Sequence, residues 1–396
     1  MLSLRQLPGI LCMLITTSLA LAQDGLKRIT LAPAMLPAAT VVTGPLLWTS
    51  QILPHADSGH SLQPQLTSCL QQLNVLLSTH QSSSQHIVRL HLCCSSSAHL
   101  QTALQLLTTA FPEDQRPCVS AVVTALPQGA LVALDATALH TAANPRQVQI
   151  HQGIALLPQG TRIFIAGQAE PSEDLAEATS KTLQSLQRTL QFLGRSDADI
   201  VQLKAFVQPM SAAHVVQQQV TRFYTGRTPP PLVLVEWKSS ATVPVEIELV
   251  AWGGAASAGA QPIEFLTPPF MTASPVYSRI SRTAHPTLIF TSGLHRLTEN
   301  TAGSGTAEEA AAAEVTETFT RLNTILQATG SDLEHLAKAT YYVAGDPVSL
   351  SLNRLRPRYY NPARPPAASK AMVQGVGSAS QTLSIDMIAV PASKQP

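Results

Sequence analysis

The sequence predicts an α+β protein built from three tandem copies of one β-α-β-α-β-β unit. Two observations carry this prediction. The same order of strands and helices appears three times along the 396 residues. Similar residues also stand at similar places in the three copies, which indicates an internal repeat. We place the units at residues 26–144, 146–253 and 272–394.

The second unit shows the layout most clearly. It opens with a strand at 160–168, and a long helix pattern with one apolar face follows from 171 to 194. The remaining elements are a strand at 200–207, a helix at 211–224 and two strands at 232–237 and 243–252.

The first and third units repeat this order. In the first unit, apolar residues recur from Leu62 to Leu77 at the 3.6-residue period of a helix. In the third unit, a helix begins at Thr306 and ends at Gly330, a typical C-cap residue. The other expected elements of the first unit are strands at 45–51, 86–93, 119–125 and 130–139 and a helix at 98–111. Those of the third unit are strands at 288–293, 336–343, 369–376 and 381–390 and a helix from 346 that breaks near Pro357.

Two sets of matching residues support the repeat. One set stands at the end of each opening strand and the other in the middle of each last strand. The first set is Ser50, Ala166 and Ser292, and the second is Asp135, Glu248 and Asp386. A segment rich in small residues at 253–260 is typical of a linker.

Composition limits the functions that the chain can have. Apolar residues make up 45% of the chain, charged residues 12%, and the net charge is +1. Nucleic-acid binding normally needs a basic face, so we expect no nucleic-acid partner. The histidines and cysteines lack the spacing of a metal site, and we expect no metal or cofactor.

The N-terminus resembles an export signal. Arg5 precedes an apolar stretch at 10–21, and the small residues around Leu21 fit a cleavage site after Ala22. An uncleaved anchor is the alternative, although the stretch is short for a membrane span. We therefore expect a signal peptide at 1–22 and an exported mature chain that stays off the membrane.

Four cysteines follow the signal. Export permits disulfides. Cys69 lies on the apolar face of a helix and the Cys93–Cys94 pair ends an apolar strand, which favours buried free thiols over disulfides.

Several motifs of the repeated unit resemble the RidA/YjgF family of imine deaminases. The opening strands end in Thr291-Ser-Gly and Ala166-Gly-Gln, a turn reads Pro362-Ala-Arg, and the last strand of the second unit reads Glu246-Ile-Glu-Leu-Val-Ala. The resemblance covers nearly the whole mature chain and is weakest in the first unit.

The resemblance implies how the units assemble. Family members form trimers with ligand sites in the clefts between subunits. Three units on one chain would then form a pseudo-trimer within a single molecule. The alternative is that the units assemble with units of other chains.

The resemblance also implies a chemistry. An arginine would bind the carboxylate of a small imine or enamine, and a glutamate would position the water that attacks the imine carbon. The products would be a 2-keto acid and ammonia. The arginine matches Arg116 in the first unit and Arg364 in the third, where the alignment could also slip to Ser369-Lys370. The second unit has Pro231 in that place.

The remaining site positions are transferred in the same way. The glutamate is present only as Glu246, with Ala133 and Ser384 at the matching positions. The other residues that the resemblance assigns to ligand binding are Ser50, Ser292, Gly293, Asn353 and Tyr277.

No single unit holds both the arginine and the glutamate. In the family the two face one cleft from neighbouring strands of one subunit, so this separation favours binding without turnover. We therefore carry two hypotheses: a deaminase acting on small carboxylate-bearing imines, and a degenerate pseudo-trimer that binds a metabolite or is purely structural. The low content of basic residues makes a ribonuclease the weakest candidate.

Overall fold

The computed structural model describes residues 25–32, 34–297, 306–378 and 380–392. The expected signal peptide at 1–22 lies outside these residues, as do parts of the third expected unit. Among the helices that are described, none is long and apolar enough to cross a membrane.

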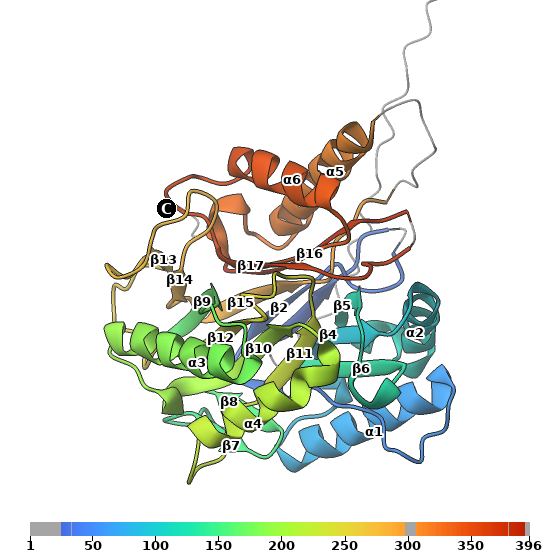
Figure 1. The fold of residues 1–396 in the computed structure, drawn as a ribbon, viewed down its shortest axis with the longest axis horizontal. Coiled ribbons are helices and arrows are strands. Elements are labelled where there is room, and N and C mark those ends of the chain that lie inside the picture. Colours follow the sequence, from blue (N-terminus) through green and yellow to red (C-terminus); the bar gives the residue numbers. More distant parts are fainter. Residues whose placement is uncertain (1–24, 33, 298–305, 379, 393–396) are drawn as a thin grey trace, which may run out of the picture.

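Three mixed sheets of six strands form the centre of the molecule, and the helices lie on the outside (Figure 1). The first unit comprises β3 (Leu46–Thr49), α1 (Leu62–Thr79), β4 (Ile87–Cys94), α2 (Ser97–Ala110), β5 (Cys118–Val123) and β6 (Val132–Leu139). The second comprises β9 (Arg162–Gln168), α3 (Leu175–Phe192), β10 (Ile200–Val207), α4 (Ala213–Phe223), β11 (Leu232–Glu236) and β12 (Val245–Trp252). The third comprises β15 (Thr287–Thr291), α5 (Ala307–Ala328), β16 (Leu336–Val343), α6 (Asp346–Leu355), β17 (Ala367–Met372) and β18 (Leu383–Ala389). The α+β class and the repeated order of elements are confirmed.

Three short hairpins were not predicted from the sequence. They are β1 (Leu26–Ile29) with β2 (Ala39–Thr43), β7 (Gln149–His151) with β8 (Ile154–Leu157), and β13 (Ile263–Leu266) with β14 (Ile280–Thr283). Strands of three to five residues carry little periodic signal, which explains why they escaped the sequence analysis.

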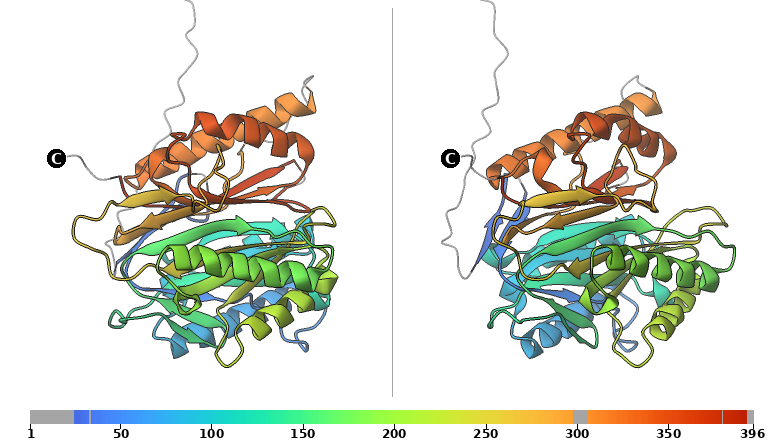
Figure 2. Two further views of the ribbon diagram at one scale, coloured as in Figure 1. Left: turned by 60° about the vertical axis from the view of Figure 1, so that its left-hand side comes forward. Right: turned by 90° about the vertical axis from the view of Figure 1, so that its left-hand side faces the viewer.

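Each hairpin joins the sheet of a unit other than the one it leads into. β8 precedes β9 in the chain but pairs with β3, and β14 precedes β15 but pairs with β9. Strand β2, near the beginning of the chain, lies beside β15 of the third unit (Figure 2), and in their antiparallel register Thr43 pairs with Thr287. The hairpins therefore connect the three sheets in a closed cycle that joins the beginning of the chain to its end.

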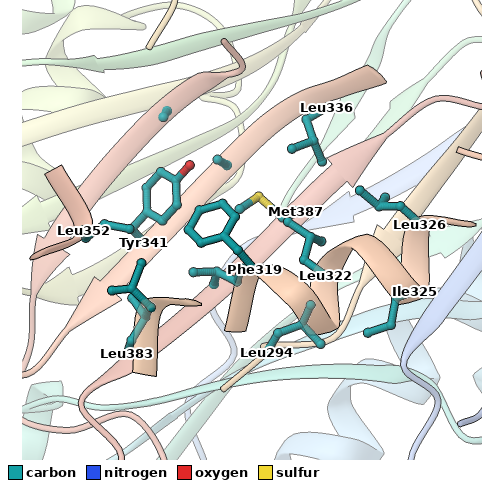
Figure 3. Packing of buried hydrophobic residues seen from close by; sticks show 14 of the residues in the cluster. Leu294, Phe319, Leu322, Ile325, Leu326, Leu336, Tyr341, Leu352, Leu383 and Met387 are labelled. Carbon is teal, nitrogen blue, oxygen red and sulfur yellow. The ribbon is translucent and has the colours of Figure 1, made fainter. Parts of the chain in front are cut away.

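The outer face of each sheet is covered by two helices. In the third unit, Phe319 and Leu322 of α5 pack against the sheet beside Tyr341 and Met387 (Figure 3). All four side chains are fully buried. Burying a large apolar side chain stabilises the fold by about 1.5–3 kcal/mol, so this packing is a main source of each unit's stability.

The inner faces of the three sheets share two apolar clusters. Trp48, Phe164 and Phe290 come from matching places on the three opening strands and lie in one cluster. Cys93, Phe206 and Tyr342 lie in the other. Residues from all three units thus contribute to one interior.

A belt of buried charged residues accompanies these clusters. Its carboxylates are the matching residues Asp135, Glu248 and Asp386, each at most 3% exposed. The pair Arg89–Asp386 joins the first unit to the third at 2.7 Å, and Lys338–Glu248 joins the third to the second at 2.7 Å. A buried charge is costly without an oppositely charged partner. Each pair therefore favours contact between the two units that hold its members.

Candidate functional site

The units meet at three equivalent junctions, where the end of one opening strand contacts the penultimate strand of a neighbouring unit. Each junction is named by its two units, with the unit of the opening strand first. At junction 1/2 the Leu232 amide donates to Ser50 Oγ at 3.2 Å. At junction 3/1 the Val119 amide donates to Ser292 Oγ at 3.0 Å. At junction 2/3 the Gly167 amide donates to Ser369 Oγ at 3.0 Å.

A hairpin residue completes each junction. The amides of Ser50, Ala166 and Ser292 donate to the carbonyls of Gly153, Arg279 and Ala38, respectively, at 2.8–2.9 Å. Each junction therefore combines two units with the hairpin that pairs with the first of them. Of these three hairpin residues, only Arg279 has a charged side chain.

Junction 1/2 opens into a cavity of about 760 Å³. Its polar lining includes Ser50, Gln51, Gln152, Gln217 and Thr221. Arg227 is the charged residue among those that line it, and its guanidinium is already paired with Asp197 at 2.8 Å. Ala133 stands at the position of the expected glutamate and is fully buried. This junction can hold a ligand, but it offers no carboxylate for acid–base chemistry.

Junction 3/1 contains Ser292, Gly293 and Arg116. The Arg116 guanidinium donates to the carbonyls of Met35 and Thr108 at 3.1 and 2.8 Å, so both of its terminal nitrogens are engaged by backbone. Ser292 Oγ donates to the Pro37 carbonyl at 2.6 Å. The polar groups of this junction are therefore largely used in holding the units together.

Junction 2/3 contains Glu246. Its side chain lies directly against Gly167, since a Cβ on that glycine would be 2.0 Å from Glu246 Oε1. The glutamate remains partly exposed. Burial and the neighbouring Glu248 raise the pKa of Glu246 to about 8, although Arg279 and Lys370 act in the opposite direction. A carboxyl group with such a pKa exists in both protonation states near neutral pH, as general acid–base catalysis requires.

The positive charges of Arg279 and Lys370 favour the ionised form of this glutamate. Arg279 precedes β14, and its Nη1 donates to Tyr277 Oη at 2.6 Å. Lys370 lies on β17, and its Nζ donates to Ser349 Oγ at 2.8 Å and to Asn353 Oδ1 at 3.3 Å. The expected site residues Tyr277 and Asn353 thus lie at the same junction as Glu246, because Tyr277 is hydrogen-bonded to Arg279 and Asn353 to Lys370.

The Arg364 guanidinium lies over an aromatic ring of the hairpin β13–β14. Its guanidinium carbon is 5.6 Å from the centre of the Phe265 ring on β13. The parallel pairing of His91 with Ser120, Lys204 with Val233, and Thr340 with Ser369 fixes the alignment of the units. In that alignment Pro229 and Pro365 match Arg116. The sequence-based alignment, which placed Pro231 opposite the arginine, was wrong by two residues.

The charged residues of junction 2/3 come from three different segments of the chain. Glu246 belongs to the second unit, Lys370 to the third, and Arg279 to the hairpin between them. Residues that are far apart along the chain are therefore close together at this junction. The alternative alignment at Ser369-Lys370 pointed to this strand, but Arg279 was missed because its hairpin was not predicted.

The cysteines offer no nucleophile. Cys69, Cys93, Cys94 and Cys118 are free and buried, as expected. Burial raises the pKa of Cys118 to about 11, which keeps the thiol protonated at neutral pH. Among the described residues, no group of three His, Cys, Asp or Glu side chains could hold a metal ion.

Comparisons with known proteins give matches at the level of structure. No family model matches the sequence, and no curated protein matches it. A YjgF-family protein from Neisseria meningitidis is 16% identical over 30% of this chain and 98% of its own, with a TM-score of 0.24. A Rid-family protein from Yersinia pestis is 26% identical over 24% of this chain and 83% of its own, with a TM-score of 0.22.

A third similar structure is that of a putative endoribonuclease from Thermotoga maritima. It is 26% identical over 27% of this chain and 80% of its own, with a TM-score of 0.23. Each match thus spans about one unit of the chain. The structures to which this chain is similar, one unit at a time, are those of the YjgF/RidA family.

Proposed function

We propose that this chain binds small imines or enamines that carry a carboxylate at junction 2/3 and hydrolyses them to a 2-keto acid and ammonia. The observation that carries the proposal is Glu246, a partly exposed carboxyl group that lies against Gly167 at the junction. Its pKa is raised to about 8, and the charges of Arg279 and Lys370 favour its ionised form. Strongly shifted pKa values combined with specific charged partners are typical of catalytic sites.

The proposed reaction needs one group that moves protons. The ionised Glu246 takes a proton from a water molecule as the water oxygen bonds to the carbon of the protonated imine, whose nitrogen becomes a neutral amine. The protonated Glu246 then gives its proton to that amine, the carbon–nitrogen bond breaks and ammonia leaves. The hydroxyl group returns its proton to Glu246 as the carbonyl forms, and Glu246 releases it to solvent. An enamine enters the same route after tautomerising to the imine.

The second candidate function is binding without turnover, and junction 1/2 favours it. Its cavity of about 760 Å³ is lined by amides and hydroxyls, with Ala133 in place of the glutamate. A chain with one reactive junction and one binding junction is compatible with both functions. The test must therefore measure turnover.

The test is an assay in which 2-aminoacrylate is generated from serine and its hydrolysis is followed. We expect the mature protein to accelerate the reaction, with a rate that rises with pH toward about 8 as Glu246 ionises. Glu246→Gln should lower the rate by about 10²–10⁴-fold, the usual contribution of a general base. Glu264→Gln is the matched control, because Glu264 forms a partly exposed ion pair with Arg282. No acceleration by the wild type, or equal rates for both variants, would leave only the binding function.

We further propose that one exported chain forms the complete assembly. Two buried ion pairs support this proposal, because each joins two different units of the same chain. Arg89–Asp386 joins the first unit to the third, and Lys338–Glu248 joins the third unit to the second. Analytical ultracentrifugation should give a single species at the 42.1 kDa mass of one chain, less any cleaved signal. A species of three times that mass would overturn it.

A further inference from the structure

We propose that Arg279, supplied by the hairpin β13–β14, is the residue that binds the substrate carboxylate at junction 2/3. This inference rests on the proposed function and identifies its anchoring residue. The family resemblance implied an arginine at the start of the penultimate strand, whereas the geometry points to the hairpin.

The backbone of Arg279 is fixed at the centre of the junction. Its carbonyl accepts the Ala166 amide at 2.9 Å, at the end of the opening strand and one residue before Gly167. Gly167 is also the residue against which Glu246 lies. Arg279 is therefore held close to the proposed acid–base group by the sheet itself.

The guanidinium is held in a defined orientation with donors to spare. Its Nε donates to the Thr272 carbonyl at 2.9 Å and its Nη1 to Tyr277 Oη at 2.6 Å, while its carbon lies 5.0 Å from the centre of the Tyr277 ring. A guanidinium has five N–H donors, so further donors remain for a ligand. The side chain is partly exposed, and because it is already oriented, it loses little conformational entropy when a carboxylate binds.

The equivalent residues show why the anchor lies on this hairpin. The matching positions at the other junctions are Gly153 and Ala38, neither of which can bind an anion through its side chain. At junction 2/3 the strand position that holds Arg116 in the first unit is Pro365. Junction 2/3 thus has Pro365 in place of an arginine before the penultimate strand, and it has Arg279 on the hairpin instead.

The other cations near the junction are less suitable. Lys370 is engaged by Ser349 and Asn353, and burial lowers its pKa. Arg364 lies over the Phe265 ring. In a 2-imino acid, one bond joins the carboxylate to the imine carbon, so the anchor must lie next to the acid–base group. Arg279 meets this requirement, since its carbonyl accepts the amide of Ala166, the residue before Gly167, and Glu246 lies against Gly167.

The test measures binding of pyruvate, the simplest 2-keto acid product, to the full chain by calorimetry. Pyruvamide serves as the ligand without a carboxylate. Arg279→Gln should weaken pyruvate binding by about 10- to 100-fold, because a hydrogen bond between charged groups is lost. Binding of pyruvamide should be weak and should not change. Arg279→Lys should recover part of the affinity.

Two matched controls separate the local effect from a general one. Arg282→Gln removes a cation from the same hairpin that pairs with Glu264, and Arg364→Gln removes the arginine expected from the resemblance. Both should bind pyruvate like the wild type. Thermal unfolding of each variant verifies that the hairpin remains folded.

The outcomes are distinguishable. If the wild type binds pyruvate and Arg279→Gln binds it equally well, Arg279 is not the anchor, while the proposed function stands. If Arg364→Gln abolishes binding instead, the anchor is the residue implied by the resemblance. If the wild type does not bind pyruvate at all, both the inference and the carboxylate ligand class are lost.

Discussion

Junctions 1/2 and 2/3 occupy equivalent places in the fold but contain different chemistry. Both join the end of an opening strand to a neighbouring penultimate strand and a hairpin. Junction 1/2 has a large cavity and a buried alanine at position 133, whereas junction 2/3 has Glu246 together with the cations Arg279 and Lys370.

This difference shows what a tandem repeat makes possible. In an assembly of identical subunits every junction must have the same residues. On a single chain each junction is encoded separately, so one can keep a reactive carboxyl group while another becomes a neutral cavity. The hydrogen bonds that hold the backbone at these junctions are retained in both cases.

The side-chain contacts that cross the junctions differ in strength. Removing the strongest of them should have the largest effect, which is on the free energy of unfolding. Lys338 pairs with Glu248 across junction 2/3, whereas Gln202 Nε2 donates to the Thr49 carbonyl across junction 1/2 at 2.9 Å. Lys338→Met should lower the free energy of unfolding by about 3–5 kcal/mol, because Glu248 would remain buried without its partner. Gln202→Leu should cost only about 1–3 kcal/mol. Urea denaturation of both variants measures the difference, and equal losses would contradict it.

Gly167 tests the close packing around Glu246. Gly167→Ala places a Cβ where the glutamate carboxyl now lies, so the Glu246 side chain must leave its present position. We expect turnover of 2-aminoacrylate to fall by about 10²-fold, in line with the loss of a positioned catalytic group. Gly293→Ala is the matched control at junction 3/1, where the added Cβ would be 3.0 Å from Ser384 Oγ. A variant of Gly167 with wild-type turnover would contradict the assignment of Glu246.

The pH dependence of stability gives the smallest effect. The pKa of Glu246 is about 8 in the folded protein against an ordinary value of 4.5. The folded state therefore holds a proton that the unfolded state loses, and this stabilising contribution is complete below pH 4.5 and lost as pH rises through 8. Relative to Glu246→Gln, the wild type should lose about 1–3 kcal/mol over this range. Urea denaturation at pH 5 and pH 8.5 measures the change, and parallel behaviour of the two proteins would exclude the raised pKa.

The sequence alone determined the repeated unit and most of its elements. Long helices have a clear 3.6-residue apolar period, and the matching residues Asp135, Glu248 and Asp386 revealed the alignment of the last strands. In the structure these three residues face His91, Lys204 and Thr340, which are themselves equivalent. Local periodicity was sufficient here because each element buries one face against its own unit.

Only the tertiary structure decided which residues come together at junction 2/3. The six hairpin strands are too short to show a period, and their pairing with a different unit depends on packing between parts of the chain that are far apart. Glu246 was identified from its motif, but its partners Arg279 and Lys370 come from other segments. The physical reason is that hydrogen bonds between strands and the burial of charge operate in three dimensions, so the junction that brings these residues together leaves no local pattern in the sequence.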